Sequence, residues 1–185
     1  MNVPKRGNNF VLANPAVCIG CATCMAGCYE SSLQRGKLAV PRLIVTRSNS
    51  GTMPNQCRQC DDAPCANVCP TGALRFGSDS IEVYEESCIG CKMCVIACPF
   101  GAIRLESEIT SLSYADSEAD SLKEVKTKAV KCDLCFGRED GPACVEVCPT
   151  GALSFVTSQY IASSVVNKKA EDAVEAFIKS SLNNR

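Results

Sequence analysis

The sequence contains no histidine and no tryptophan, and its 185 residues include only six phenylalanines and four tyrosines. Without histidine there is no imidazole for general acid–base catalysis and no Rieske-type cluster, which needs two histidine ligands. The sequence also lacks a Gly-rich phosphate-binding loop and any signature of a pterin or flavin pocket. We therefore expect a protein that is not itself an enzyme. Its apolar content is thin for its length, so we expect disulfides or metal to cross-link the chain.

Long hydrophobic runs and blocks of like charge are also missing. Because no run of eighteen apolar residues occurs, no membrane span is predicted. The chain has 19 basic and 20 acidic residues and a formal net charge of −1, which excludes a basic nucleic-acid footprint. No apolar stretch of the kind found in secretory signals follows residues 1–6. The default expectation is a cytoplasmic protein, although a partner with an export signal can carry such a chain across a membrane.

Cysteine, by contrast, is abundant, and all sixteen cysteines fall into four groups of four. In chain order, the quartets are Cys18, Cys21, Cys24, Cys28; Cys57, Cys60, Cys65, Cys69; Cys88, Cys91, Cys94, Cys98; and Cys132, Cys135, Cys144, Cys148. The first and third have the spacing C-x2-C-x2-C-x3-C, in which three cysteines bind one 4Fe-4S cluster and the fourth binds another. The second and fourth quartets are variants with a delayed third cysteine. The sequence thus predicts four 4Fe-4S clusters bound by these sixteen cysteines.

Two other uses of cysteine compete with this interpretation. Disulfides are disfavoured because no export signal is visible and because cysteines so close in sequence make poor bridge partners. Structural zinc sites usually join two separated C-x2-C pairs and often include histidine. Here three cysteines are evenly spaced, and proline follows the fourth in three quartets, at Pro70, Pro99 and Pro149. We also expect Gly20 and Gly90 to allow a close approach of the backbone in the two Cys-Ile-Gly-Cys stretches.

An internal repeat accompanies the quartets. The segments 69–74 and 148–153 share the sequence Cys-Pro-Thr-Gly-Ala-Leu, and 98–103 is a close variant. Strand-like runs follow them at 74–76, 103–105 and 153–155, and others precede the quartets at 10–12, 43–45 and 81–84. Residues 77–79 (Gly-Ser-Asp) predict a hairpin turn between 74–76 and 81–84. Each quartet thus belongs to half of a two-cluster ferredoxin unit, and the fold class is α+β with short antiparallel strands.

The spacing of the quartets favours one pairing. The second and third quartets are close in sequence and most simply form one unit, so the first and fourth pair around it. The predicted ligand sets are Cys18, Cys21, Cys24 with Cys148; Cys132, Cys135, Cys144 with Cys28; Cys57, Cys60, Cys65 with Cys98; and Cys88, Cys91, Cys94 with Cys69. Sequential pairing of the first quartet with the second, and of the third with the fourth, is the alternative that the residues leave open.

Residues 10–156 resemble the four-cluster ferredoxin subunits of molybdenum or tungsten oxidoreductases, such as those of dimethyl sulfoxide reductase and formate dehydrogenase. The stretches 60–65 and 131–144 are particularly similar to the ferredoxin-like subunits of formate hydrogenlyase and of hydrogen-dependent carbon dioxide reductase. The resemblance implies the nested pairing, with an outer unit of 1–42 and 107–156 around an inner unit of 43–106. One position departs from the pattern, because Tyr29 and not proline follows Cys28. Some relatives carry a 3Fe-4S centre after losing a ligand, but all sixteen cysteines are present here.

Outside the quartets, three features call for an interpretation. Arg58, Lys92 and Lys131 lie in or beside the cysteine loops and are either solvated surface charges or groups that raise a cluster's potential. The Ser-, Glu- and Asp-rich segment 107–128 is expected to be a solvent-facing loop, with a possible strand at 124–130. In the C-terminal extension 157–185, apolar residues at helical spacing over 168–182 predict an amphipathic helix. This helix either packs on its own chain or docks a partner subunit.

Four clusters in one small chain suit electron transfer between two remote sites. The resemblance implies a subunit that links a molybdenum or tungsten formate dehydrogenase-type enzyme to a hydrogenase, another ferredoxin-like subunit or another redox partner. Two alternatives remain open. In the first, the chain is a free polyferredoxin that serves several enzymes. In the second, it is an accessory protein for the assembly of hydrogenase or formate dehydrogenase.

Overall fold

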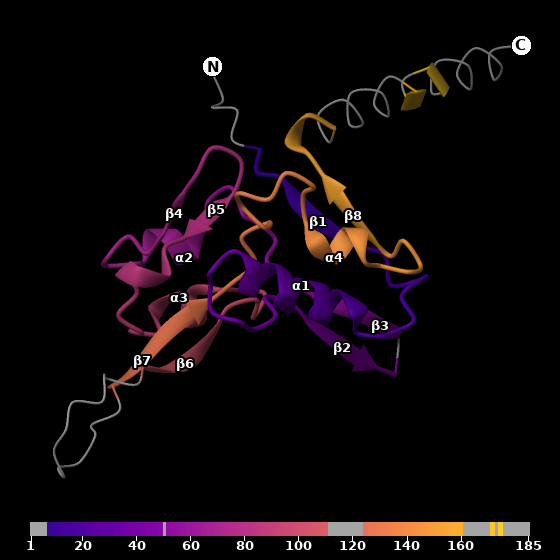
Figure 1. Ribbon diagram of the computed structural model, residues 1–185. Coiled ribbons are helices and arrows are strands. Elements are labelled where there is room, and N and C mark those ends of the chain that lie inside the picture. Colours follow the sequence, from indigo (N-terminus) through magenta and orange to yellow (C-terminus); the bar gives the residue numbers. More distant parts are fainter. Residues whose placement is uncertain (1–6, 50, 111–123, 161–170, 173, 176–185) are drawn as a thin grey trace, which may run out of the picture.

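The two ends of the cysteine-rich region pair with each other. In the computed structural model, which describes residues 7–49, 51–110, 124–160, 171, 172, 174 and 175, strand β1 (Phe10–Ala13) runs antiparallel to β8 (Leu153–Val156). Side chains alternate along β1, so that Val11 and Ala13 are buried and Leu12 is exposed. This pairing brings the first and fourth quartets to the same side of the molecule (Figure 1).

All elements between these strands are short. In chain order they are α1 (Thr23–Gln34), β2 (Ile44–Ser48), β3 (Gly51–Asn55), α2 (Pro64–Asn67), β4 (Leu74–Phe76), β5 (Ile81–Val83), the 3-10 helix η1 (Glu85–Ser87), α3 (Met93–Ala97), β6 (Arg104–Thr110), β7 (Glu124–Val130) and α4 (Ala143–Glu146). Among the described residues every sheet has two strands, paired as β1–β8, β2–β3, β4–β5 and β6–β7. The small architecture of helices and short antiparallel strands agrees with the predicted α+β class.

Two separate hydrophobic cores hold these elements together. One contains residues from the segments of the first and fourth quartets, where helix α1 packs against α4. Its buried members are Val11, Ala13, Cys24, Cys28, Leu43, Cys144 and Leu153. The other contains residues from the second and third quartets, where α2 packs against α3. Its buried members are Ala63, Cys65, Leu74, Ile81, Val83, Cys94, Ile103 and Ala129.

Most strands lie where the sequence predicts them, and the turn at 77–79 is part of a hairpin in which Leu74 lies opposite Val83. The predicted strand at 124–130 is confirmed as β7 (Glu124–Val130), but the loop predicted from residue 107 begins later, because β6 continues to Thr110. Strand β6 continues to Thr110 and β7 begins at Glu124, so the polar segment forms much of a long hairpin, with Ser107 opposite Thr127. Alternating Ser, Glu, Thr and Lys suit a two-sided exposed ribbon, which a search for apolar runs does not find.

Most of the predicted C-terminal helix over 168–182 lies outside the described residues. Within it, Glu171, Asp172, Val174 and Glu175 are described and have helical backbone. Over the described part of the chain, no helix is both long enough and apolar enough to cross a membrane.

Candidate iron–sulfur sites

The first predicted ligand set lines a surface pocket. Site A comprises Cys18, Cys21, Cys24 and Cys148, and all four line one pocket together with Val45, Pro54 and Leu153. Cys21 is exposed and Cys24 is buried. The hydroxyl of Thr23 donates a hydrogen bond of 3.3 Å to the Cys21 Sγ atom and lowers the pKa of that thiol. Four sulfurs from opposite ends of the chain therefore surround one cavity, because β1 pairs with β8.

A second surface pocket repeats this arrangement in the other half of the molecule. Site C comprises Cys88, Cys91, Cys94 and Cys69, and these four residues line a pocket with Leu74, Val83 and Ala129. As in site A, one cysteine is exposed (Cys91), one is buried (Cys94) and two are half-buried. Burial raises the pKa of Cys69, but hydrogen bonds from the backbone N–H of Leu74 and from Thr71 outweigh it and lower the pKa.

The other two predicted sets lie deeper. Site B comprises Cys57, Cys60, Cys65 and Cys98, of which Cys57 and Cys65 are buried. The pKa of the Cys65 thiol is raised to about 11. Burial is the main cause, the charge of Lys131 opposes it, and the nearby thiols of Cys57 and Cys98 add to it. These mutual effects mean that cysteines from the second and third quartets lie close together.

Site D is the most enclosed. It comprises Cys132, Cys135, Cys144 and Cys28, and all four cysteines are buried. Burial, together with the nearby thiols of Cys28 and Cys135, raises the pKa of the Cys144 thiol to about 12. Burial likewise raises the pKa of Cys132 well above its ordinary value. A thiol in this environment becomes a thiolate only when it gains a strong positive partner such as a metal.

Hydrogen-bond donors point at sulfur atoms in each of the four sites. Backbone N–H groups donate to Cys28 from Arg42 (3.1 Å), to Cys57 from Gln59 (3.3 Å), to Cys88 from Ala129 (3.3 Å), to Cys98 from Ala102 (3.4 Å) and to Cys148 from Ala152 (3.3 Å). The Ser31 hydroxyl donates to Cys135 at 3.4 Å. Such donors stabilise sulfur that carries negative charge, so the donor chemistry fits thiolate ligands of iron–sulfur clusters.

The loops of sites A and C use backbone conformations that ordinary residues avoid. Gly20 and Gly90 have φ values of +70° and +67°, and Ala22 and Lys92 adopt left-handed conformations directly before their helices. A Cβ atom added to Gly20 would lie 2.8 Å from the Thr52 side chain, and one added to Gly90 would lie 2.8 Å from the Thr127 carbonyl oxygen. Each loop therefore packs tightly on a hairpin, β2–β3 for site A and β6–β7 for site C.

The cysteines are arranged around cavities and not around single points. All sixteen lie in the described residues, and all are free of disulfide bonds. Among those residues, no three Cys, Asp or Glu side chains come together closely enough to hold a single metal ion. A cubane cluster makes a different demand, because each cysteine binds a different iron atom and the ligands surround the cluster.

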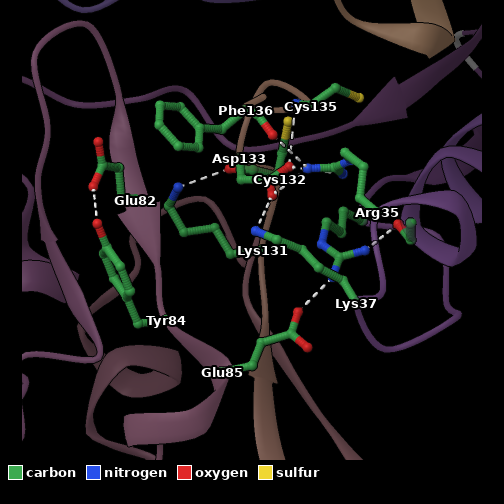
Figure 2. A network of polar contacts seen from close by, with 12 residues as sticks. Arg35, Lys37, Glu82, Tyr84, Glu85, Lys131, Cys132, Asp133, Cys135 and Phe136 are labelled. Atoms are coloured by element: carbon green, nitrogen blue, oxygen red, sulfur yellow. Dashed lines mark hydrogen bonds and ion pairs between the residues drawn. The ribbon is translucent and has the colours of Figure 1, made fainter. Parts of the chain in front are cut away.

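Charged side chains lie around site D, and no local sequence pattern indicates most of them. Asp133 is buried between two cations, with Arg35 Nη1 2.9 Å from its Oδ2 atom and Lys37 on the same oxygen (Figure 2). Burial favours a raised pKa for Asp133, but the hydrogen bond from Arg35 and the charge of Lys37 outweigh it and lower the pKa. Arg42, also buried, pairs with Glu85.

The three basic residues predicted to flank the loops differ in burial. Lys92 is exposed and Arg58 is half-buried, with its guanidinium carbon 5.9 Å from the centre of the Phe100 ring. Lys131 is fully buried, so its interpretation as a solvated surface charge is wrong. Neighbours from distant parts of the chain cover it, and no local sequence signal reports such contacts.

Comparison with known proteins places the chain in a family. Residues 87–152 match the family model described as a 4Fe-4S dicluster domain, and residues 53–109 match the LdpA Fe-S cluster-binding domain. The chain is 38% identical over 174 residues to the electron transport protein HydN of Escherichia coli, covering 90% of this chain and 98% of that protein. It is 39% identical over 172 residues to Escherichia coli formate hydrogenlyase subunit 2, covering 84% of this chain and 85% of that subunit. It is 36% identical over 182 residues to Escherichia coli hydrogenase-4 component A, covering 88% and 89%. The chain therefore belongs to the family of ferredoxin-type iron–sulfur electron-transport proteins that includes HydN and formate hydrogenlyase subunit 2.

Proposed function

We propose that sites A, B, C and D each bind one 4Fe-4S cluster and that the chain relays electrons within a larger redox complex. The single observation that carries the proposal is the gathering of ligands from different quartets. The same four cysteines that the nested pairing assigns to site A line one pocket, and the four assigned to site C line another. Sequential pairing does not account for Cys148 beside Cys18, or for Cys69 beside Cys88.

The nested arrangement also defines two units. The outer unit contains sites A and D, and the pairing of β1 with β8 and of α1 with α4 supports it. The inner unit contains sites B and C, and the packing of α2 on α3 supports it. The boundaries differ from those expected at 43 and 107. Leu43 and the β2–β3 hairpin belong with the outer core, and Ala129 of β7 belongs with the inner core. We therefore assign residues 7–55 and 131–156 to the outer unit and 56–130 to the inner one.

The chain's own residues prepare each site for a one-electron centre. A bound 4Fe-4S cluster supplies reversible one-electron transfer. Backbone N–H groups orient and stabilise the thiolates, and the buried core residues keep water away from sites B and D. Exposed Cys21 and Cys91 put sites A and C at the surface, where redox partners can approach. The two surface sites therefore form the natural ends of the relay, with sites B and D between them.

The partners are inferred from the relatives' names. Formate hydrogenlyase subunit 2 and hydrogenase-4 component A are named as parts of complexes, and both align along most of their length. By analogy, the partners proposed here are a molybdenum or tungsten formate dehydrogenase-type catalytic subunit and a hydrogenase or another ferredoxin-like subunit. The second candidate is a free electron carrier, which the likeness to HydN favours, because HydN is named only as an electron transport protein.

Anaerobic co-purification from the native host separates the two. A tagged chain that elutes with a formate dehydrogenase-type subunit and a hydrogenase at near-equal amounts supports the subunit role. Elution as an iron-loaded monomer at every expression level tested would exclude it and support the free carrier. Metal analysis of the same sample should give about sixteen irons per chain, as the cysteine count predicts.

A further inference from the structure

Lys131 is a fully buried lysine at the boundary between the two proposed units. It follows β7 and directly precedes Cys132 of site D. Its Nζ atom donates hydrogen bonds to the carbonyl oxygens of Cys132 (2.7 Å) and Ile81 (2.8 Å) and to Oε1 of Gln59 (3.3 Å). An ammonium group has three N–H donors, so all of its hydrogen-bonding capacity is used.

The hydrogen bonds are satisfied, but the charge is not. Within the described residues, no carboxylate lies within 4.0 Å of the Lys131 ammonium. The other buried cation, Arg42, pairs with Glu85, and the Arg35 side chain pairs with Asp133. A buried ammonium without a counter-charge costs several kcal/mol relative to water. The fold therefore places a buried cation beside two of the cysteine sites, with no described carboxylate in direct contact with it.

Lys131 contacts residues that belong to two of the proposed sites. Gln59, which accepts from Lys131, lies in the site B loop between Cys57 and Cys60. Cys132, whose carbonyl accepts from Lys131, belongs to site D. Lys131 thus contacts the loops of both site B and site D.

The side chain of Gln59 holds this arrangement in place. Its Oε1 atom accepts from the Ile81 backbone N–H at 2.9 Å as well as from Lys131, and its Nε2 atom donates to the Cys132 carbonyl at 2.9 Å. Gln59 itself is buried and has a φ of +50°. Lys131 therefore has a fixed position, set by residues from both proposed units.

We propose that the Lys131 ammonium is the shared buried counter-charge of sites B and D and that it raises the reduction potential of both. This inference rests on the proposed binding of four clusters. A 4Fe-4S centre held by four thiolates is anionic, and its reduction adds one more negative charge. A fixed cation nearby favours the added electron, and the weakly screening interior strengthens this attraction. Lys131 is a positioning and tuning residue, since it binds no iron itself.

The test is an EPR-monitored redox titration of the anaerobically purified full-length protein and its variants. Lys131→Met removes the charge and keeps a similar volume, and Lys131→Gln removes the charge and keeps a hydrogen-bonding group. Lys126→Met is the matched control, because Lys126 lies on β7, a few residues before Lys131, but is exposed. Iron content is measured for every sample before titration.

Both Lys131 variants should lower two of the four midpoint potentials. The one-electron reduction constant of each of these centres should fall about tenfold, which corresponds to about 59 mV for a one-electron couple. The other two centres and all four centres of Lys126→Met should titrate as in the wild type. Loss of the irons of sites B and D alone would equally support a shared counter-charge.

Three results would overturn the inference. They are unchanged potentials in fully loaded Lys131 variants, an equal shift in all four centres, and loss of all irons in both variants, which would make Lys131 a residue needed only for folding. A wild-type protein that fails to bind about sixteen irons would instead refute the proposed function. The iron count of the wild type therefore separates the two failures.

Discussion

Sites A and C at the surface, which each have one exposed cysteine, differ from sites B and D in the interior, where no cysteine is exposed. Sites A and C each have one exposed, one buried and two half-buried cysteines, whereas all four cysteines of site D are buried. Thiol pKa values are lowered at Cys21, Cys69 and Cys148 of the surface sites. They are raised by burial at Cys65 and Cys144.

This difference separates two tasks within one fold. The surface sites use the regular ferredoxin spacing, and each is backed by a two-stranded hairpin that touches its glycine. The interior sites use the irregular spacings, are enclosed by packed cores and are surrounded by buried charges such as Lys131 and Asp133. Regular loops thus lie where partners can approach, and irregular loops lie where the chain itself must supply the electrostatic environment.

Removing one ligand from each class should give the largest contrast. Cys144→Ala should lose about four irons and destabilise the protein severely, because Cys144 lies in a core with Val11 and Leu153. Cys91→Ala should also lose about four irons but leave the fold nearly intact, because Cys91 is exposed. We expect their free energies of unfolding to differ by at least about 3 kcal/mol. Thermal unfolding followed by circular dichroism checks this, and equal melting temperatures would remove the distinction between the classes.

Iron release should separate the same two classes in the wild-type protein. Treated anaerobically with a strong chelator, the protein should lose about half of its irons in a fast phase and the rest in a slow one. The slow phase requires local opening of the core, and an opening free energy of only ~1.4 kcal/mol slows release about tenfold. Absorbance at the cluster bands gives the kinetics. A single exponential covering all the iron would contradict a division into accessible and enclosed sites.

The buried charges near site D can be tested through Asp133. Asp133→Asn leaves Arg35 and Lys37 without their carboxylate and should cost about 3 kcal/mol of unfolding free energy at pH 7. Because the folded-state pKa of Asp133 is lowered, this stabilisation is present above the ordinary aspartate pKa and is lost as the pH falls below it. Glu86→Gln is the control, since Glu86 is 94% exposed and its pairing with Lys128 is loose at 3.9 Å. Denaturant unfolding of both variants measures the effect, and equal losses would argue against a special role for the interior charges.

The contact between the site C loop and its hairpin should give the smallest effect. Gly90→Ala places a methyl group 2.8 Å from the Thr127 carbonyl oxygen in a left-handed residue and should cost about 2 kcal/mol. Gly36→Ala has the same kind of φ but nothing within 4 Å, so it should cost only about 1 kcal/mol. Chemical denaturation distinguishes them, and an equal cost would mean that the hairpin yields freely.

The sequence predicted this architecture wherever short-range patterns carry the information. The repeated Cys-Pro-Thr-Gly-Ala-Leu segments end in β4 and β8, and the glycine at 77 marks the β4–β5 turn. The two Cys-Ile-Gly-Cys stretches predicted the tight loops at Gly20 and Gly90, whose φ values are +70° and +67°. These features depend on neighbours in sequence, so they can be read directly from it.

What the sequence did not predict depends on contacts between distant residues. Lys131 looks like a surface charge beside a cysteine, and only contacts with Gln59 and Ile81, more than 49 residues away, bury it. Asp133 is likewise buried by Arg35 and Lys37, about a hundred residues earlier in the chain. The strand at 124–130 was predicted, but the extension of β6 to Thr110 and its pairing with β7 were not. Tertiary packing decides these features, and no local propensity reports them.

We propose that sixteen cysteines hold four cubane clusters, two near the surface and two enclosed. Native mass spectrometry of the anaerobically purified chain tests it most directly, because it weighs the bound inorganic atoms on the intact protein. With four clusters bound, one dominant species should carry about sixteen irons and as many sulfides. After brief chelation, a second species with about half that load should appear. A chain that carries zinc, or no more than about eight irons before chelation, would contradict it.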